Sequence, residues 1–207
     1  MSLYGRLFTA IYDPFLAWGE RSGMAKLRRS ILAQASGDVL EVGAGTGLNL
    51  RAYPAAVTRL TLADPEPSMA DRLRSVAAGD PRRPTVVQAG AEALPFPDAS
   101  FDTVVSTLVL CTVDDVAGSL AEIRRVLRPG GRLLLIEHVR ADGSGLSGWQ
   151  DRLEKPWKAF GYGCRCNRDT RASLTRAGFE TGALQDARWP RMPPIVAPLL
   201  VGPVHPA

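Results

Sequence analysis

The chain has 207 residues, enough for one domain with a sizeable core, and its shares of hydrophobic (45%) and charged (22%) residues are ordinary for a globular protein. Its apolar runs are too short to cross a bilayer and its three cysteines too few for a disulfide framework, so we predict a cytoplasmic protein. The net charge of +4 comes from dispersed arginines instead of a dense basic stripe, which argues against a nucleic-acid partner.

The first part of the chain has the apolar periodicity of helices. Residues 3–18 place apolar and aromatic side chains at helical spacing, and Pro14 and Gly19 separate this segment from a second helix expected over 20–35. We predict that residues 1–36 form a helical cap, in which 3–18 is a lid over the ligand. A packing helix and a peripheral membrane contact are the alternatives.

From residue 37 onward strands and helices alternate, which is typical of a mostly parallel sheet with helices on both faces. The expected strands cover 39–42, 57–63, 85–89, 101–109, 132–139 and 179–184, and the expected helices cover 46–53, 67–78, 114–127, 149–160 and 168–177. Residues 143–148 read as a flexible link. The proline-rich tail after residue 188 reads as irregular, with a last strand that is short or formed by 195–201. We therefore predict an α/β fold with one globular domain over 37–207.

A glycine-rich turn follows the first expected strand. Gly43, Gly45 and Gly47 allow a sharp turn and the close approach of a ligand to main-chain N–H groups. Their spacing is one residue tighter than the dinucleotide fingerprint, and Glu41 would repel a pyrophosphate but attract an ammonium group. The pattern predicts a ligand with an adenosine-like end and a cationic amino-acid end, which describes S-adenosylmethionine (SAM). A turn that only joins a strand to a helix is the alternative.

Further candidate residues follow the next strands, at the sheet edge where such folds bind ligands. Asp64 comes twenty-one residues after Gly43 and could accept hydrogen bonds from two ribose hydroxyls, although nicotinamide-binding proteins share this feature and a helix cap needs no ligand. The loop 91–96 could meet an adenine edge. Residues 106–113 should lie at the reacting centre, and they lack the Asn/Asp-Pro-Pro-aromatic sequence expected for DNA or protein-glutamine substrates.

Residues 37–140 resemble the class I SAM-dependent methyltransferases, in the branch that includes the ubiquinone and menaquinone biosynthesis enzymes. The resemblance rests on Leu-Glu-Val-Gly-Ala-Gly-Thr-Gly, Asp64, Ala-Glu-Ala-Leu-Pro-Phe, Phe-Asp-Thr-Val-Val and Leu-Arg-Pro-Gly-Gly, in that order. It implies a Rossmann-like fold with a seven-stranded sheet. A narrower similarity, to the methyltransferase-like thiol S-methyltransferases, rests on segments 107–111, 137–139, 149–150, 156–157, 163–164 and 201–203.

The resemblance also implies a set of site residues. Glu41 and the glycine turn would hold the methionine end of SAM, Asp64 the ribose, and Ala91 with Glu92 the adenine. The full set of expected cofactor-binding residues is Glu41, Gly43, Ala44, Gly45, Gly47, Asp64, Pro65, Met69, Ala91, Glu92, Thr107 and Leu108. The chain departs from many relatives at Gly90, where they have Asp, so the adenine contact would rest on Ala91 and Glu92.

We predict a methyltransferase that acts on a small molecule, with a thiol sulfur as the preferred acceptor. A phenol, a quinone carbon or a lipid amine is the alternative acceptor, and a non-catalytic SAM-binding protein is the alternative function. His138 follows the fifth strand and could be a catalytic base or a structural residue. Cys111 is expected to pack, no metal site is expected, and Trp149, Trp157 and Phe160 either shape the acceptor pocket or pack. The oligomeric state stays open.

Overall fold

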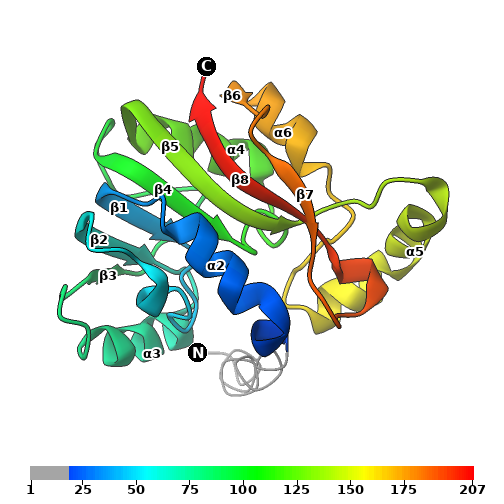
Figure 1. Ribbon diagram of the computed structural model, residues 1–207, viewed down its shortest axis with the longest axis horizontal. Helices are drawn as coiled ribbons and strands as arrows, with labels where there is room; N and C mark the ends of the chain where they lie inside the picture. The colour runs from blue at the N-terminus through cyan, green and yellow to red at the C-terminus, as the bar shows by residue number, and fades with distance from the viewer. Residues whose placement is uncertain (1–18) are drawn as a thin grey trace.

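The computed structural model describes residues 19–207 (Figure 1). Within this range, eight strands form one sheet in the order β3-β2-β1-β4-β5-β8-β6, and β7 also pairs with β8. The strands are β1 (Gly37–Val42), β2 (Val57–Ala63), β3 (Thr85–Val87), β4 (Phe101–Thr107), β5 (Leu127–His138), β6 (Phe179–Glu180), β7 (Gln185–Arg188) and β8 (Pro198–Pro206). The pairs among β1 to β5 are parallel, and β8 is antiparallel to each of its three neighbours.

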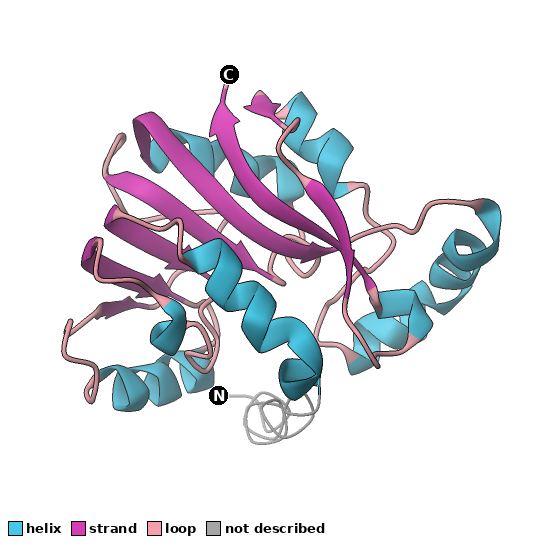
Figure 2. Cartoon of the chain, in the orientation of Figure 1, coloured by secondary structure: helices cyan, strands magenta, loops and turns pink. Residues whose placement is uncertain are grey.

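Helices cover both faces of the sheet, as predicted (Figure 2). The helices are the π-helical turn η1 (Glu20–Met24), α2 (Ala25–Leu32), α3 (Pro67–Ala77), α4 (Val116–Val126), α5 (Ser144–Phe160) and α6 (Thr170–Arg176), with short 3₁₀ turns η2 (Leu50–Ala52) and η3 (Pro194–Val196). Within residues 19–207, every helix is too short or too polar to span a bilayer.

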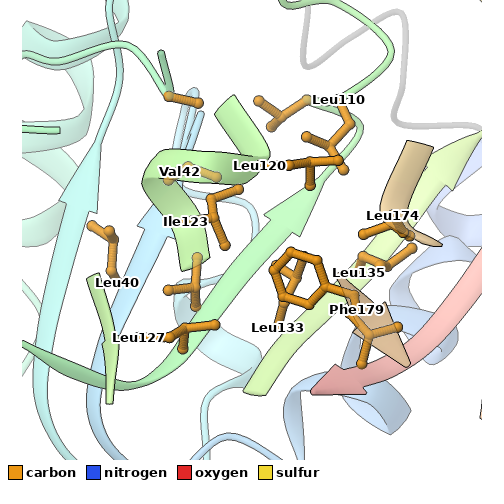
Figure 3. Packing of buried hydrophobic residues seen from close by; sticks show 14 of the residues in the cluster. Leu40, Val42, Leu110, Leu120, Ile123, Leu127, Leu133, Leu135, Leu174 and Phe179 are labelled. Carbon is orange, nitrogen blue, oxygen red and sulfur yellow. The ribbon is translucent and has the colours of Figure 1, made fainter. Parts of the chain in front are cut away.

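The core lies in two layers because successive strand residues point to opposite faces. On one face, residues such as Val39 and Leu134 pack with α2 and α3. On the other face, Leu40 and Leu133 pack with α4 and α6. Figure 3 shows this layer, to which Leu120 and Ile123 of α4 belong. The strands β1, β4 and β5 are therefore buried on both faces, as expected for a parallel sheet.

The outer edge of the sheet is divided. Pairing of β7 with β8 ends at Val201, and pairing of β6 begins at His205. Gly202 and Pro203 lie between the residues that pair with β7 and those that pair with β6. Proline has no backbone N–H, and its absence has little cost where no strand pairs on that side. Two short strands thus fill the position that a seven-stranded sheet gives to one.

Four local predictions were wrong. The strand predicted over 179–184 is only the two-residue β6, which a turn follows. Residues 46–53 form turns and the short η2 instead of an α-helix, because Gly47 has φ +83° and Pro54 holds Tyr53 in an extended conformation. The predicted link 143–148 is mostly the first turn of α5, which begins at Ser144. The tail that was predicted to be irregular contains η3 and the nine-residue β8. The last strand is β8, which overlaps the predicted 195–201 only in residues 198–201.

Candidate active site

Most of the predicted cofactor-binding residues lie at or just after the carboxyl ends of β1, β2, β3 and β4, which are neighbours in the sheet. Because these four strands are parallel, their carboxyl ends meet at one edge. The strand order reverses between β1 and β4, where an open α/β sheet splays its loops apart. The topology therefore brings Glu41, Asp64, Ala91 and Thr107 to one region.

The glycine turn packs tightly on one side and is open on the other. A Cβ at Gly43 would lie 2.4 Å from Cγ2 of Val109, so only glycine fits between β1 and the loop after β4. At Gly45, which has φ +56°, the nearest atom to a Cβ would be the Gly43 carbonyl oxygen at 4.0 Å. The open side leaves room for a ligand to approach the backbone of the turn.

Glu41 lies at the end of β1 inside a buried polar network. One carboxylate oxygen accepts a hydrogen bond from Asn49 Nδ2 (2.8 Å) and the other from the Tyr53 hydroxyl (2.7 Å). Asn49 also donates to Thr107 Oγ1 (3.1 Å) and accepts from Arg28 of α2 (2.9 Å). This network joins the glycine turn, β4 and the cap helix through one side chain.

Burial raises the pKa of Glu41 to about 7, although its hydrogen bonds to Tyr53 and Asn49 and the charge of Arg28 favour the carboxylate. A nearby cation would lower this pKa, because it stabilises the charged form. The site thus holds a carboxyl group poised to ionise when a cation binds.

Asp64 supports the glycine turn from the neighbouring strand. Its Oδ2 accepts a hydrogen bond from Gly45 N (2.8 Å) and its Oδ1 accepts one from Glu66 N (3.0 Å). Burial raises the pKa of Asp64, while these two bonds favour the carboxylate. Each oxygen keeps a lone pair that could accept a further hydrogen bond, as a diol would require.

The residues expected around the adenine differ in exposure. Ala91 and Met69 are buried, whereas Pro65 and Glu92 are exposed. Glu92 Oε1 accepts a hydrogen bond from Asp114 N (3.2 Å), which links the loop after β3 to the loop after β4. Ala44, in the glycine turn, donates its N–H to the Ala63 carbonyl (2.9 Å).

The end of β4 has an unusual backbone. Leu108 has φ +60°, a left-handed conformation that is uncommon for a residue with a branched side chain. Its N–H donates to the Ile136 carbonyl (2.8 Å), which keeps the strained residue in register with β5. Strained residues of this kind cluster at functional sites.

A second buried carboxylate, Glu137, holds the turn that follows Leu108. It accepts hydrogen bonds from the Ser106 hydroxyl (2.7 Å), Val109 N (3.0 Å) and Cys111 N (3.2 Å). Burial raises the pKa of Glu137, and these donors oppose the shift. The carboxylate therefore fixes the loop expected at the reacting centre.

An apolar cluster lies beyond this loop. Cys111, Cys164, Cys166 and Val196 are buried together, and Trp157 packs against them. The Sγ atoms of Cys111 and Cys164 are 3.8 Å apart, and their hydrogen bond and burial raise the pKa of the Cys111 thiol. Burial raises the pKa of Cys166 to about 12. Cys111 and Cys166 are thus packing thiols at neutral pH, in agreement with the expectation for Cys111.

The other aromatic candidates on α5 face solvent. Trp149 is 55% exposed and Phe160 is 58% exposed, while the ring of Trp157 lies 5.5 Å from that of Phe160. Of the three, Trp157 alone packs against the cysteine cluster within the described residues.

His138 is buried on the opposite face of the sheet from Glu137, because it is the next residue of β5. Its ring stacks on Trp189 with 5.7 Å between centroids, and its Nδ1 has no hydrogen-bond partner among residues 19–207. Burial lowers the pKa of His138 to about 4. The ring is therefore neutral at pH 7 and a weak proton acceptor.

The sequence analysis missed several residues that organise the site. Asn49, Tyr53 and Arg28 complete the Glu41 network, and Ser106 binds Glu137. Asn49 alone offers a signal, because it is a polar residue between two leucines directly after the glycine turn. The other partners come from segments that only the fold brings together.

We expect Glu137→Gln to lower the free energy of unfolding by about 1–3 kcal/mol, because an amide NH₂ would face a buried donor that the carboxylate now satisfies. Urea unfolding measures the change. Glu180→Gln, on the exposed residue of β6, is the matched control and should change stability by less than about 0.5 kcal/mol. Equal stability of the Glu137 variant and the wild type would show that the turn does not depend on this carboxylate.

Comparison with known proteins identifies the family of the chain. A family model described as a methyltransferase domain matches residues 40–135. The chain is 36% identical to human thiol S-methyltransferase TMT1A over 199 residues, which cover 94% of this chain and 81% of the relative. It is 40% identical to human thiol S-methyltransferase TMT1B over 178 residues, which cover 83% of this chain and 70% of the relative.

The fold is also shared with solved structures. The crystal structure of a SAM-dependent methyltransferase from Thermotoga maritima matches with a TM-score of 0.69 at 23% identity, covering 96% of this chain and 94% of that chain. The family match and the thiol S-methyltransferase relatives confirm the predicted SAM-dependent methyltransferase, and with it SAM as the cofactor. The chain belongs to the SAM-dependent methyltransferases and is a relative of the thiol S-methyltransferases.

Proposed function

We propose that the protein transfers the methyl group of SAM to the sulfur of a small-molecule thiol. The observation that carries this proposal is the identity of 36% and 40% with two human proteins named thiol S-methyltransferases, over most of the chain. The apolar cluster beside the end of β4 is compatible with a soft, uncharged acceptor. A phenol, an amine or a quinone is the alternative acceptor.

We further propose that SAM lies across the carboxyl end of β1. Its ammonium group would approach Glu41, its ribose hydroxyls would bind Asp64, and its adenine would lie near Ala91 and Glu92. The raised pKa of Glu41 and the free lone pairs of Asp64 support the first two contacts. The open side of Gly45 supports a close approach of the methionine end.

The reaction is an in-line displacement. The lone pair of the thiolate sulfur forms a bond to the methyl carbon, and the electron pair of the breaking carbon–sulfur bond returns to the sulfonium sulfur, giving S-adenosylhomocysteine. The thiol proton goes to solvent before the attack. Because a thiolate and a sulfonium neutralise each other, an apolar environment does not oppose this step, and the protein contributes by orienting the reactants and excluding water.

His138 has no part in the mechanism that we propose. With a pKa lowered to about 4, it would hold a thiol proton poorly, and its stacking on the buried Trp189 favours a packing role. The thiols that react best should then be those that ionise readily in solution.

The role of the cap also remains a proposal. Arg28 of α2 binds Asn49, which supports a link between residues 1–36 and the cofactor site. The predicted lid over 3–18 lies outside the described residues, and so does the alternative of a membrane contact there. The cytoplasmic location remains a prediction from composition.

Asp64→Asn should weaken SAM binding by about 10- to 100-fold, because it replaces one acceptor oxygen of a charged hydrogen-bonding group. Isothermal titration calorimetry measures the affinity, and thermal melting checks that the variant is folded. Asp71→Asn, on the exposed surface of α3, is the control and should bind SAM like the wild type. An unchanged affinity of the Asp64 variant would remove the ribose assignment.

Release of S-adenosylhomocysteine with a panel of thiols, phenols, amines and quinols tests the acceptor. We expect turnover with small alkyl thiols and little with the other classes. Turnover of a phenol, amine or quinol in the presence of inert thiols would contradict the thiol proposal and leave only the cofactor assignment.

The same assay decides the role of His138. His138→Phe keeps an aromatic ring against Trp189, and we expect its thiol turnover to stay within about threefold of the wild type. A loss of about 10²- to 10⁴-fold, with SAM affinity unchanged, would instead identify a general base.

A further inference from the structure

We propose that Tyr162 is a positioning residue that ties the acceptor side of the site to the ribose side. Tyr162 lies in the segment 161–168, between α5 and α6. The proposal rests on the placement of SAM proposed above. The inference concerns how this segment, here called the strap, crosses the carboxyl end of β1.

One end of the strap is bound to the loop after β4. The N–H of Arg165 donates to the Cys111 carbonyl (2.7 Å), and the guanidinium of Arg168 donates to the carbonyls of Leu110 and Val113. Gly163 packs so closely that a Cβ there would lie 3.3 Å from the Thr112 carbonyl oxygen. The strap is thus bound along the loop after β4, whose backbone N–H groups also bind Glu137.

The other end of the strap reaches the loop after β2. The Tyr162 hydroxyl donates a hydrogen bond of 2.6 Å to Glu66 Oε2. Glu66 follows Asp64 by two residues, and its own N–H donates to Asp64 Oδ1 (3.0 Å). The phenol therefore contacts the segment that orients the proposed ribose-binding carboxylate.

The sheet order gives this contact its meaning. Strand β1 lies between β2 and β4, so the contacts of the strap with the loops after these two strands lie on either side of the end of β1. The glycine turn lies at that end. The backbone of Tyr162 has φ +50°, which is unfavourable for a residue with a side chain and indicates that its surroundings determine its orientation.

A cofactor at the end of β1 would therefore lie beneath a bridge between the ribose loop and the acceptor loop. The hydrogen bond between Tyr162 and Glu66 should slow the dissociation of SAM and keep its methyl group aligned with the acceptor. The hydroxyl of Tyr162 completes this bridge, because it donates the hydrogen bond to Glu66 in the loop after β2.

The test is the dissociation rate of SAM, measured by stopped-flow tryptophan fluorescence after addition of excess S-adenosylhomocysteine. Tyr162→Phe removes only the hydroxyl and should raise this rate about three- to tenfold. Glu66→Ala should do the same, and the double variant should be no faster than either single variant, because both act through one hydrogen bond. Glu66→Gln, which keeps an acceptor oxygen, should restore a rate near that of the wild type.

Ser100→Ala is the matched control, since it also removes one hydroxyl hydrogen bond, to the Pro97 carbonyl (2.7 Å), before β4 begins. It should leave the SAM dissociation rate unchanged. A wild-type rate in Tyr162→Phe, or additive effects of the two single variants, would overturn the role of Tyr162 while leaving the methyltransferase proposal intact. A wild-type protein that does not bind SAM would overturn both.

Discussion

The organisation of the site depends on the burial of the Glu41 carboxyl group. A buried carboxylate is stable only with hydrogen-bond donors around it, and the donors here are Asn49 and Tyr53. Asn49 in turn binds Thr107 and Arg28, so the glycine turn, the end of β4 and helix α2 are all held by partners of one side chain. These contacts stabilise the bent conformation of residues 43–53, which Gly47 and Pro54 prevent from forming an α-helix.

The same device recurs along the sheet edge. Asp64 at the end of β2 accepts N–H groups of the glycine turn and of Glu66, and Glu137 at the end of β5 accepts those of the loop after β4. Each carboxyl group accepts hydrogen bonds from backbone N–H groups of a turn that lies outside the helices and strands. A cation at this edge would favour the ionised form of Glu41, and loss of the sulfonium charge on methyl transfer would weaken the attraction between cofactor and carboxylate.

Much of the fold could be predicted from the sequence, because buried parallel strands and their turn residues leave local patterns. The bounds of β2 were predicted residue for residue, and those of α3 within one residue. The start of α5 was predicted too late, because Gly143, Ser144, Gly145 and Gly148 are typical of a flexible link. The contacts of Gln150, whose side chain donates to the carbonyls of Val139, Cys166 and Ile195, come from distant parts of the chain and leave no local pattern. The last strand was predicted over 195–201 and ends five residues later, at Pro206, because the prolines of the tail suggested a loop, whereas β5 pairs with β8 along one edge. Candidate site residues could be chosen by their position after strands, but their hydrogen-bond partners depend on tertiary contacts.

The most direct test of this account is the proton balance of SAM binding, measured by calorimetry at pH 6.5 in buffers of different ionisation enthalpy. At this pH an ordinary α-amino group, with a pKa of about 7.7–8.0, is already protonated, and so is most of Glu41, whose pKa is about 7. If the ammonium group of SAM binds beside Glu41, the pKa of that carboxyl group falls, and binding should release about half a proton or more in the wild type and almost none in Glu41→Gln. No release at pH 6.5, or the same release from Glu41→Gln, would contradict the central role of Glu41.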